Sequence, residues 1–157
     1  MFEPIVSAVL PSMLSGNGTI VLGTTGASNR ALSMEGNTAL TIGSNIVVRG
    51  KNGTIGQAYI SGGNQFLINN GRISADVAGG SISLTPSNGI TNNGVLEAQN
   101  GGTLVLNSSV IGNVGGSIAA GVGSTVLQNG VALSGVINTS GSGSFRAVAV
   151  WGCESGP

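Results

Sequence analysis

A sequence phrase that occurs twice constrains the fold of this chain more than any other feature. The phrase NNGRISADVAGGSISL begins at Asn69, and the similar phrase NNGVLEAQNGGTLVL begins at Asn92. Aligning their openings places Ile73 with Leu96. A period near 20 residues with short apolar clusters and Gly, Asn and Ser between them is typical of solenoids. We therefore expect each repeat to form one coil that stacks on the next.

The period extends beyond these two phrases in three sets of apolar positions. The first set recurs every 22 residues, at Ile82, Leu104 and Val126. The second recurs at separations of 23, 22 and 19 residues, at Ile73, Leu96, Ile118 and Ile137. The third comprises residues 89–91, 110–112 and 131–133. Three clusters in each period predict three short strands per coil, a triangular cross-section, and strands that are parallel from coil to coil.

The fold class predicted from this pattern is all-β, a right-handed parallel β-helix. Handedness follows from the strong preference of parallel strand crossovers for the right-handed connection. Residues 15–147 accommodate about six coils and a rod about 29 Å long, at about 4.8 Å per coil. Residues 1–14 are predicted to be a non-repeat segment and a candidate cap, and residues 148–157 a non-repeat tail.

An antiparallel meander is the competing interpretation. The dipeptide Asn-Gly occurs seven times, and Asn-Gly between strands is a strong hairpin signal. Hairpin strands, however, should alternate apolar and polar residues over five or six positions, whereas the apolar runs here are three or four residues long. Similarity also returns after about 22 residues and not between neighbouring runs. The solenoid is favoured, and Gly and Asn are expected to supply left-handed backbone geometry at its corners.

Composition agrees with a folded, charge-poor solenoid. Glycine and proline make up 33 of 157 residues, but 40% of residues are apolar and only 6% are charged, the opposite of a disordered chain. Like charges at equivalent positions of stacked coils would lie about 4.8 Å apart and repel, which explains their scarcity. Outward Ser and Thr can instead form hydrogen-bonded ladders along the axis.

The charge balance also excludes several kinds of partner and site. Five basic and five acidic residues include no cluster suited to nucleic acid or to an anionic membrane surface. Histidine is absent, which excludes histidine catalysis and histidine metal ligands. Cys153 is the single cysteine and forms no internal disulfide. The apolar opening has Glu3 where a signal peptide carries basic residues, so we expect no export signal. No segment has the roughly 18 consecutive apolar residues that a membrane span needs, so we expect no span.

Several phrases of the body resemble the β-strand repeats of large bacterial exported proteins. They are SGNGTIVLG, LTIGSNIVVRGKNGTIG, LINNGRISADVAGGSISL, NNGVLEAQNGGTLVLNSSV and GSTVLQNGVALSGVINTSGSGSF. The chain is similar over about residues 15–147 to autotransporter passengers and filamentous-haemagglutinin-like adhesins. That resemblance implies a right-handed parallel β-helix that holds a binding region away from the cell. It also implies a location outside the cell or on a bacterial surface, with host or environmental glycans or proteins as partners.

Pectin-degrading hydrolases and lyases use the same fold, so the acidic residues were considered for catalysis. They are Glu3, Glu35, Asp76, Glu97 and Glu154. The repeat alignment places Asp76 near Gln99 and Glu97 near Ser74 in neighbouring coils, which makes Asp76 and Glu97 the one candidate dyad. The favoured interpretation is that both are solvated corner acids.

The basic residues receive similar structural interpretations. Arg72 is expected to form a surface ion pair with the nearby Asp76. The stretch Arg49-Gly50-Lys51 is interpreted as a solvated corner in preference to a contact for an acidic glycan.

The favoured function is a structural stalk segment of an adhesin-like protein, with no catalytic residue, cofactor or metal of its own. Two alternatives remain open. One is a polysaccharide-binding or polysaccharide-degrading β-helix. The other is a self-assembling filament subunit, because an uncapped parallel solenoid presents open strand edges at its ends.

Overall fold

The structure is a computed structural model that describes residues 6–8, 12–23, 30–129, 132–139 and 141–148. The described residues form β-strands and no helix. The strands are β1 (Val6–Ala8), β2 (Ser12–Leu14), β3 (Gly18–Leu22), β4 (Ala31–Met34), β5 (Thr38–Ile42), β6 (Ile46–Gly50), β7 (Asn52–Ile55), β8 (Gln65–Asn69), β9 (Arg72–Ala75), β10 (Ser81–Leu84), β11 (Gly89–Asn92), β12 (Val95–Ala98), β13 (Thr103–Leu106), β14 (Val110–Ala120), β15 (Thr125–Asn129), β16 (Ala132–Thr139) and β17 (Ser144–Val148).

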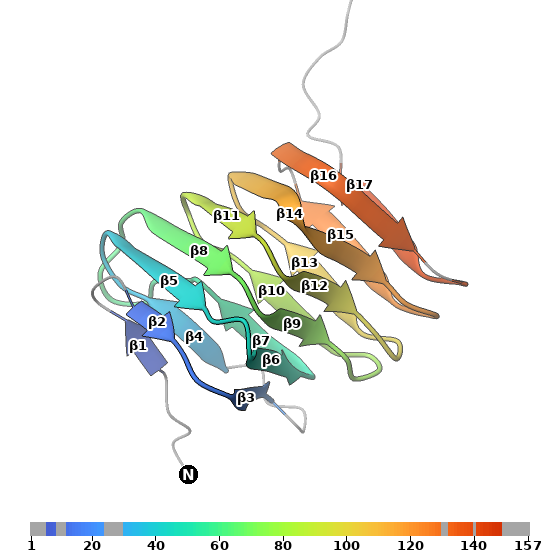
Figure 1. The fold of residues 1–157 in the computed structure, drawn as a ribbon, viewed down its shortest axis with the longest axis horizontal. Coiled ribbons are helices and arrows are strands. Elements are labelled where there is room, and N and C mark those ends of the chain that lie inside the picture. The colour runs from blue at the N-terminus through green and yellow to red at the C-terminus, as the bar shows by residue number, and fades with distance from the viewer. Residues whose placement is uncertain (1–5, 9–11, 24–29, 130–131, 140, 149–157) are drawn as a thin grey trace, which may run out of the picture.

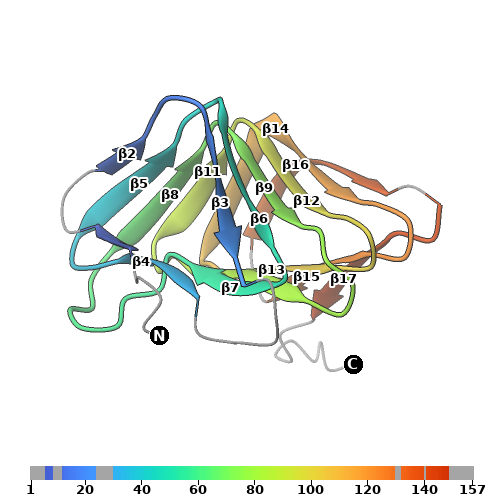
Figure 2. The same ribbon diagram turned by 90° about the horizontal axis from the view of Figure 1, so that it is seen from below.

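These strands build three long faces (Figures 1 and 2). Face 1 is the seven-stranded sheet β1-β4-β7-β10-β13-β15-β17. Face 2 contains β2, β5, β8 and β11, and face 3 contains β3, β6, β9 and β12. The long strand β14 pairs with β11 through its first residues and with β12 through its last, so it turns the corner between faces 2 and 3, and β16 stacks on it. In Figure 2, faces 2 and 3 meet at the upper corner while face 1 closes the lower side.

Every described strand pair is parallel and joins neighbouring coils. Five complete turns run from β4 to β16; β1–β3 form a shorter turn before them, and β17 begins another. The parallel β-helix is confirmed, with three short strands in each turn up to β12, and the antiparallel meander is excluded for these residues. In the turns β13–β14 and β15–β16, one longer strand covers faces 2 and 3. Strands β1 and β2 pair with β4 and β5, so both sheets begin within the segment 1–14. Of the expected tail, Val148 belongs to β17, and residues 149–157 lie outside the described residues.

The register of the coils follows the repeat alignment. On face 3 it aligns Ile73 with Leu96, Leu96 with Ile118, and Ile118 with Ile137. Aligned inward residues of successive coils form stacks, which we call columns. The columns on the other faces are Ile82, Leu104 and Val126 on face 1 and Ile90, Ile111 and Leu133 on face 2. The inward residues of these columns are fully buried through the central turns and form one continuous hydrophobic core. Side chains alternate inward and outward along each strand because successive residues point to opposite faces.

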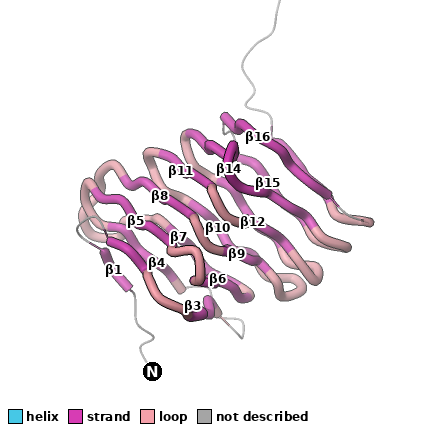
Figure 3. Tube along the Cα trace, viewed as in Figure 1, coloured by secondary structure: helices cyan, strands magenta, loops and turns pink. Residues whose placement is uncertain are grey.

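Loops occupy most corners of the coils (Figure 3), and polar side chains make contacts between neighbouring coils on the outer surface. On face 1 the Oγ1 of Thr125 lies 3.0 Å from the Oγ of Ser144, a hydrogen-bonded contact of the predicted Ser/Thr kind. At the corners, Asn100 is the only non-glycine residue in the described chain with a left-handed φ, 53°. Twelve described glycines have a left-handed φ as well, so glycine supplies most of the geometry that was expected of glycine and asparagine together.

Three asparagines at the corner between faces 2 and 3 turn inward and form a buried ladder. The Nδ2 of Asn69 donates to the Oδ1 of Asn92 over 2.7 Å, and the Nδ2 of Asn92 donates to the Oδ1 of Asn113 over 2.6 Å. Asn113 in turn donates to the carbonyl of Val136 over 2.7 Å. All three amides are at most 1% exposed. The interior therefore consists of hydrophobic columns and one amide column that links three coils.

Candidate functional site

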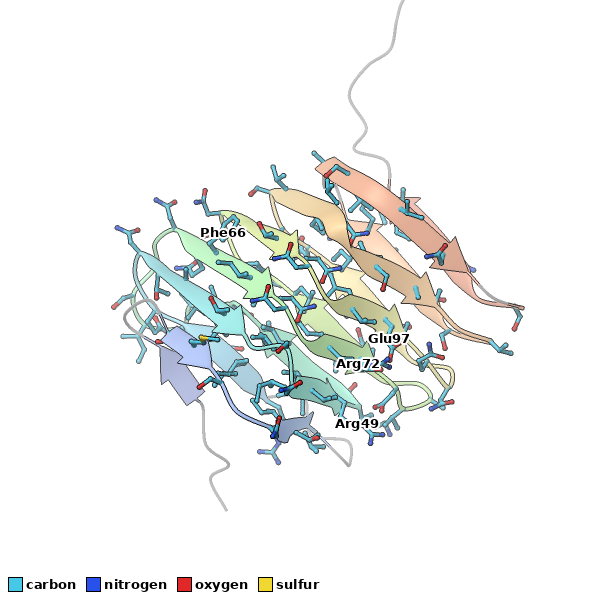
Figure 4. The ribbon with its side chains drawn as sticks, viewed as in Figure 1. Arg49, Phe66, Arg72 and Glu97 are labelled. Atoms are coloured by element: carbon cyan, nitrogen blue, oxygen red, sulfur yellow. The ribbon has the colours of Figure 1, made fainter. Side chains whose placement is uncertain are left out.

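Four charged side chains gather on the outside of face 3, and Figure 4 labels three of them, Arg49, Arg72 and Glu97. Arg49 lies on β6, Arg72 on β9 and Glu97 on β12, and Asp76 follows β9 directly. The first three point outward because their neighbours Val48, Ile73 and Leu96 occupy the inward positions. The three strands lie side by side, so residues from three successive coils meet on one surface.

Glu97 receives the densest set of contacts in this cluster. Its Oε1 accepts hydrogen bonds from the Nη1 of Arg72 over 2.6 Å and from the Oγ of Ser74 over 2.8 Å. Its Oε2 accepts from the Nε2 of Gln99 over 3.4 Å. The Glu97 side chain is 8% exposed, whereas that of Arg72 is 50% exposed. The carboxylate is therefore held beneath the guanidinium group.

Asp76 has the same relation to the preceding arginine. Its Oδ2 lies 2.5 Å from the Nη2 of Arg49, and the two side chains are 10% and 50% exposed. The other oxygen, Oδ1, is buried and has no hydrogen-bond partner among the described residues. This oxygen is an unused acceptor beside a half-exposed cation.

These pairings correct two expectations from the sequence. Glu97 is a buried strand residue and Asp76 is largely covered, so they are not solvated corner acids. Arg72 pairs with Glu97, and Asp76 pairs with Arg49. Each arginine reaches diagonally to the next coil, to a carboxylate two residues beyond its aligned partner. The strand alignment predicts which backbone positions are neighbours. It does not predict which carboxylate an arginine contacts, because that depends on the length and direction of the side chain.

The cluster lines an open groove. One depression of about 260 Å³ is lined by Val47, Arg49, Arg72, Ser74, Asp76 and Glu97. A second, of about 270 Å³, shares Arg49 and Asp76 with the first and continues toward Val21 and Gly23. We call these two depressions the face-3 groove. The charged groups that reach its surface are mainly guanidinium groups, because the carboxylates lie underneath.

The structure brings the candidate dyad of Asp76 and Glu97 into one groove. Each carboxylate is covered by its own arginine, and the structure records no hydrogen bond between the two acids. A polysaccharide-cleaving pair needs one carboxyl group to donate a proton and the other to reach the sugar ring. Here Asp76 is bound to Arg49 and Glu97 is bound to Arg72.

The stretch Arg49-Gly50-Lys51 is divided between two environments. Arg49 belongs to strand β6 and to the groove, so its interpretation as a corner residue was wrong. Lys51 lies at the corner between β6 and β7, where the sequence placed it.

Glu35 has a structural role that the sequence did not predict, because there it was only one of five acidic residues. It follows β4, is 5% exposed, and accepts hydrogen bonds from the backbone N–H groups of Tyr59, Ile60 and Ser61 over 2.8, 3.1 and 2.7 Å. The Oγ of Ser33 donates to it over 2.8 Å. The backbone donors, Tyr59 first and Ser61 next, lower the pKa of Glu35 from 4.5 to about 2.

The consequence is a loop that one carboxylate holds in place. Residues 56–64 join β7 to β8 and present Tyr59 and Ile60 to solvent, 51% and 89% exposed. No sequence pattern singled out Glu35, because its partners lie 24 to 26 residues away along the chain.

Acid is expected to weaken this attachment. The folded pKa of Glu35 lies below the unfolded value, so its contribution to stability is complete above about pH 4.5 and is lost as pH falls toward about 2. Thermal melts of the wild type and of Glu35→Gln from pH 7 to pH 2 test this. The wild type should melt higher at neutral pH, and the two curves should converge as pH approaches 2. A gap that does not change with pH would contradict the assignment.

Removal of the Arg72 guanidinium group is expected to destabilise the fold, because the buried carboxylate of Glu97 loses its charged partner. Arg72→Gln should lower the free energy of unfolding by about 1–2 kcal/mol, less than for a fully buried pair because Arg72 is half exposed. Urea denaturation measures the change. The double variant Arg72→Gln/Glu97→Gln should recover most of the loss, and Arg146→Gln on β17 should change stability by less than about 0.5 kcal/mol. Equal losses in the single and double variants would show that burial of Glu97 is not responsible.

The described residues include no metal-binding cluster and no membrane-spanning helix. They contain no group of three or more Cys, Asp or Glu side chains placed to hold a metal ion. They also contain no helix with the length and apolar character needed to cross a membrane. Cys153, Glu3 and Glu154 lie outside the described residues.

Comparisons with protein-family models, with curated proteins and with solved structures found no match to this chain. The functional interpretation therefore depends on the geometry of the solenoid and of its face-3 groove.

Proposed function

We propose that this chain is a structural β-helical stalk segment of a secreted or surface-exposed bacterial adhesin-like protein. The observation that carries the proposal is the uninterrupted stacking of coils: one hydrophobic cluster extends from Leu22 to Val126, and an amide ladder runs beside it. A stalk must hold its ends apart without dedicated chemistry along its length. Coils that contact mainly their neighbours, through parallel backbone hydrogen bonds and a shared core, provide this.

The resemblance of the repeats to exported adhesins supplies the cellular location in this proposal. An antibody raised against the purified chain should label intact cells of the producing organism, and external protease should remove the label. Labelling that requires permeabilised cells would overturn the surface location. Labelling of intact cells combined with a helical or disordered circular dichroism spectrum of the purified chain would overturn the stalk.

End-to-end association is a second candidate, favoured by the last described turn. Its inward residues Leu133, Ile137 and Phe145 are only partly buried, unlike their counterparts in the central turns. A further coil with the same register would cover them, and a second copy of this chain offers such a coil in the strands β1–β3. Sedimentation velocity at increasing protein concentration should then show growth of elongated species. A single monomer boundary throughout would remove this candidate.

A further inference from the structure

The face-3 groove presents positive charge to solvent although it contains equal numbers of acids and bases. Arg49 and Arg72 are each 50% exposed, whereas their partners Asp76 and Glu97 are 10% and 8% exposed. Glu35, the remaining described acid, is also buried. A ligand that enters the groove therefore meets guanidinium groups before it meets carboxylates.

Both guanidinium groups are held in a defined orientation. Each binds, across one coil, to a carboxylate two residues beyond its aligned partner, so the same diagonal pairing occurs twice in succession. A guanidinium group has five N–H donors, and the contact recorded for each arginine engages one nitrogen. Donors that are already ordered lose less conformational freedom when they bind an anion.

The two arginines are spaced for an extended ligand. Arg49 aligns with Ser74 on the neighbouring strand, two residues from Arg72, so Arg49 and Arg72 are diagonal neighbours. Backbone positions in this relation are about 7–8 Å apart. One ligand chain lying across the groove can thus place a separate group on each arginine, and Val47, which aligns with Arg72, offers an apolar surface.

The groove also offers an acceptor that is not in use. The Oδ1 of Asp76 is buried without a hydrogen-bond partner, and Asp76 lines both depressions. A ligand donor that reaches this oxygen is bound favourably, because a buried acceptor without a partner carries a desolvation penalty that the new hydrogen bond offsets.

We propose that the face-3 groove binds an acidic polysaccharide, with anionic groups of the sugar on Arg49 and Arg72 and a sugar hydroxyl on Asp76. A ligand with both anions and hydroxyl donors matches this combination of guanidinium donors and a free carboxylate acceptor. This site adds a binding activity to the structural role and does not depend on it, since a groove of this kind can work on any solenoid.

The test uses variants that leave the net charge of the chain unchanged. Arg49→Gln/Asp76→Asn and Arg72→Gln/Glu97→Gln each remove one cation and one anion, so non-specific attraction to a polyanion is preserved. Titration calorimetry with alginate, dextran sulfate and neutral dextran compares carboxylate, sulfate and uncharged sugars. Thermal melts establish that each variant is folded. Arg146→Gln, on face 1, is the control for loss of a distant cation.

Alginate is expected to bind the wild type, and each pair variant should bind about tenfold more weakly, the effect of losing one charge-assisted contact. Arg146→Gln should bind within about twofold of the wild type. Stronger binding of dextran sulfate, with the same losses in the pair variants, would support the site and identify its anion as sulfate. Absence of binding to both charged polymers, equal binding of neutral dextran, or unchanged affinity of the pair variants would each overturn the proposal.

Discussion

Replacement of Asn92 by alanine is expected to lower the free energy of unfolding by about 3–5 kcal/mol, because several buried polar groups lose their partners at once. Asn92 accepts from Asn69 and donates to Asn113 within the amide ladder. Its Nδ2 also lies 3.0 Å from the carbonyl of Ser117 and 3.3 Å from that of Gly94. All of these bonds are lost in Asn92→Ala, and the surrounding coils exclude the water that could replace them.

The neighbouring asparagine provides a matched control. Asn93 is exposed, and its side chain donates a hydrogen bond from Nδ2 to the Oδ1 of Asn70 over 2.9 Å. Asn93→Ala should therefore change the free energy of unfolding by less than about 0.5 kcal/mol. Urea denaturation followed by circular dichroism measures both variants. Similar effects at the two positions would mean that the buried ladder is not a major source of stability.

Gly94→Ala is expected to cost about 3–4 kcal/mol, at the upper end of the range for overpacking. A Cβ at Gly94 would lie 2.1 Å from the carbonyl oxygen of Gly71 in the preceding coil and 2.8 Å from backbone atoms of Asn70. These are backbone atoms whose positions are fixed by the stacked strands, so they cannot move aside. The loss should appear as a lower urea midpoint.

Gly62→Ala is a control that distinguishes steric overlap between coils from the loss of glycine's backbone flexibility. Gly62 lies in the loop between β7 and β8, and a Cβ there would meet no atom within 4 Å. Its substitution should change the urea midpoint very little. A loss as large as that of Gly94→Ala would show that glycine is needed for chain flexibility and not for close approach of the coils.

The inward columns could be predicted from the sequence because they repeat in one dimension. Ile73, Leu96, Ile118 and Ile137 were aligned from their spacing alone, and the structure gives the same alignment. Hydrophobicity at a fixed period specifies which side chains must leave water, and a parallel coil is the arrangement that stacks them. The position of Glu97 beside Ser74 followed from the same alignment.

The ion pairs and the amide ladder could not be predicted in this way. Whether Arg72 reaches Asp76 or Glu97 depends on the direction of a long side chain and on the distance between coils, and neither is encoded in the repeat. Similarly, Asn92 and Asn93 are consecutive and chemically identical. Only the turn of the backbone at the corner sends the first inward and the second outward.

The sequence by itself determined the fold class, the length of the coil and the register of its hydrophobic columns, because these depend on a repeated local pattern of apolar residues. The tertiary structure decided which polar groups are buried and what they bind. It placed Glu35 under the loop from β7 to β8, Asn92 within the core, and two carboxylates beneath the arginines of the face-3 groove. Polar side chains gain stability only when a partner lies at hydrogen-bond distance and in the right direction, and these conditions exist only after the coils have stacked.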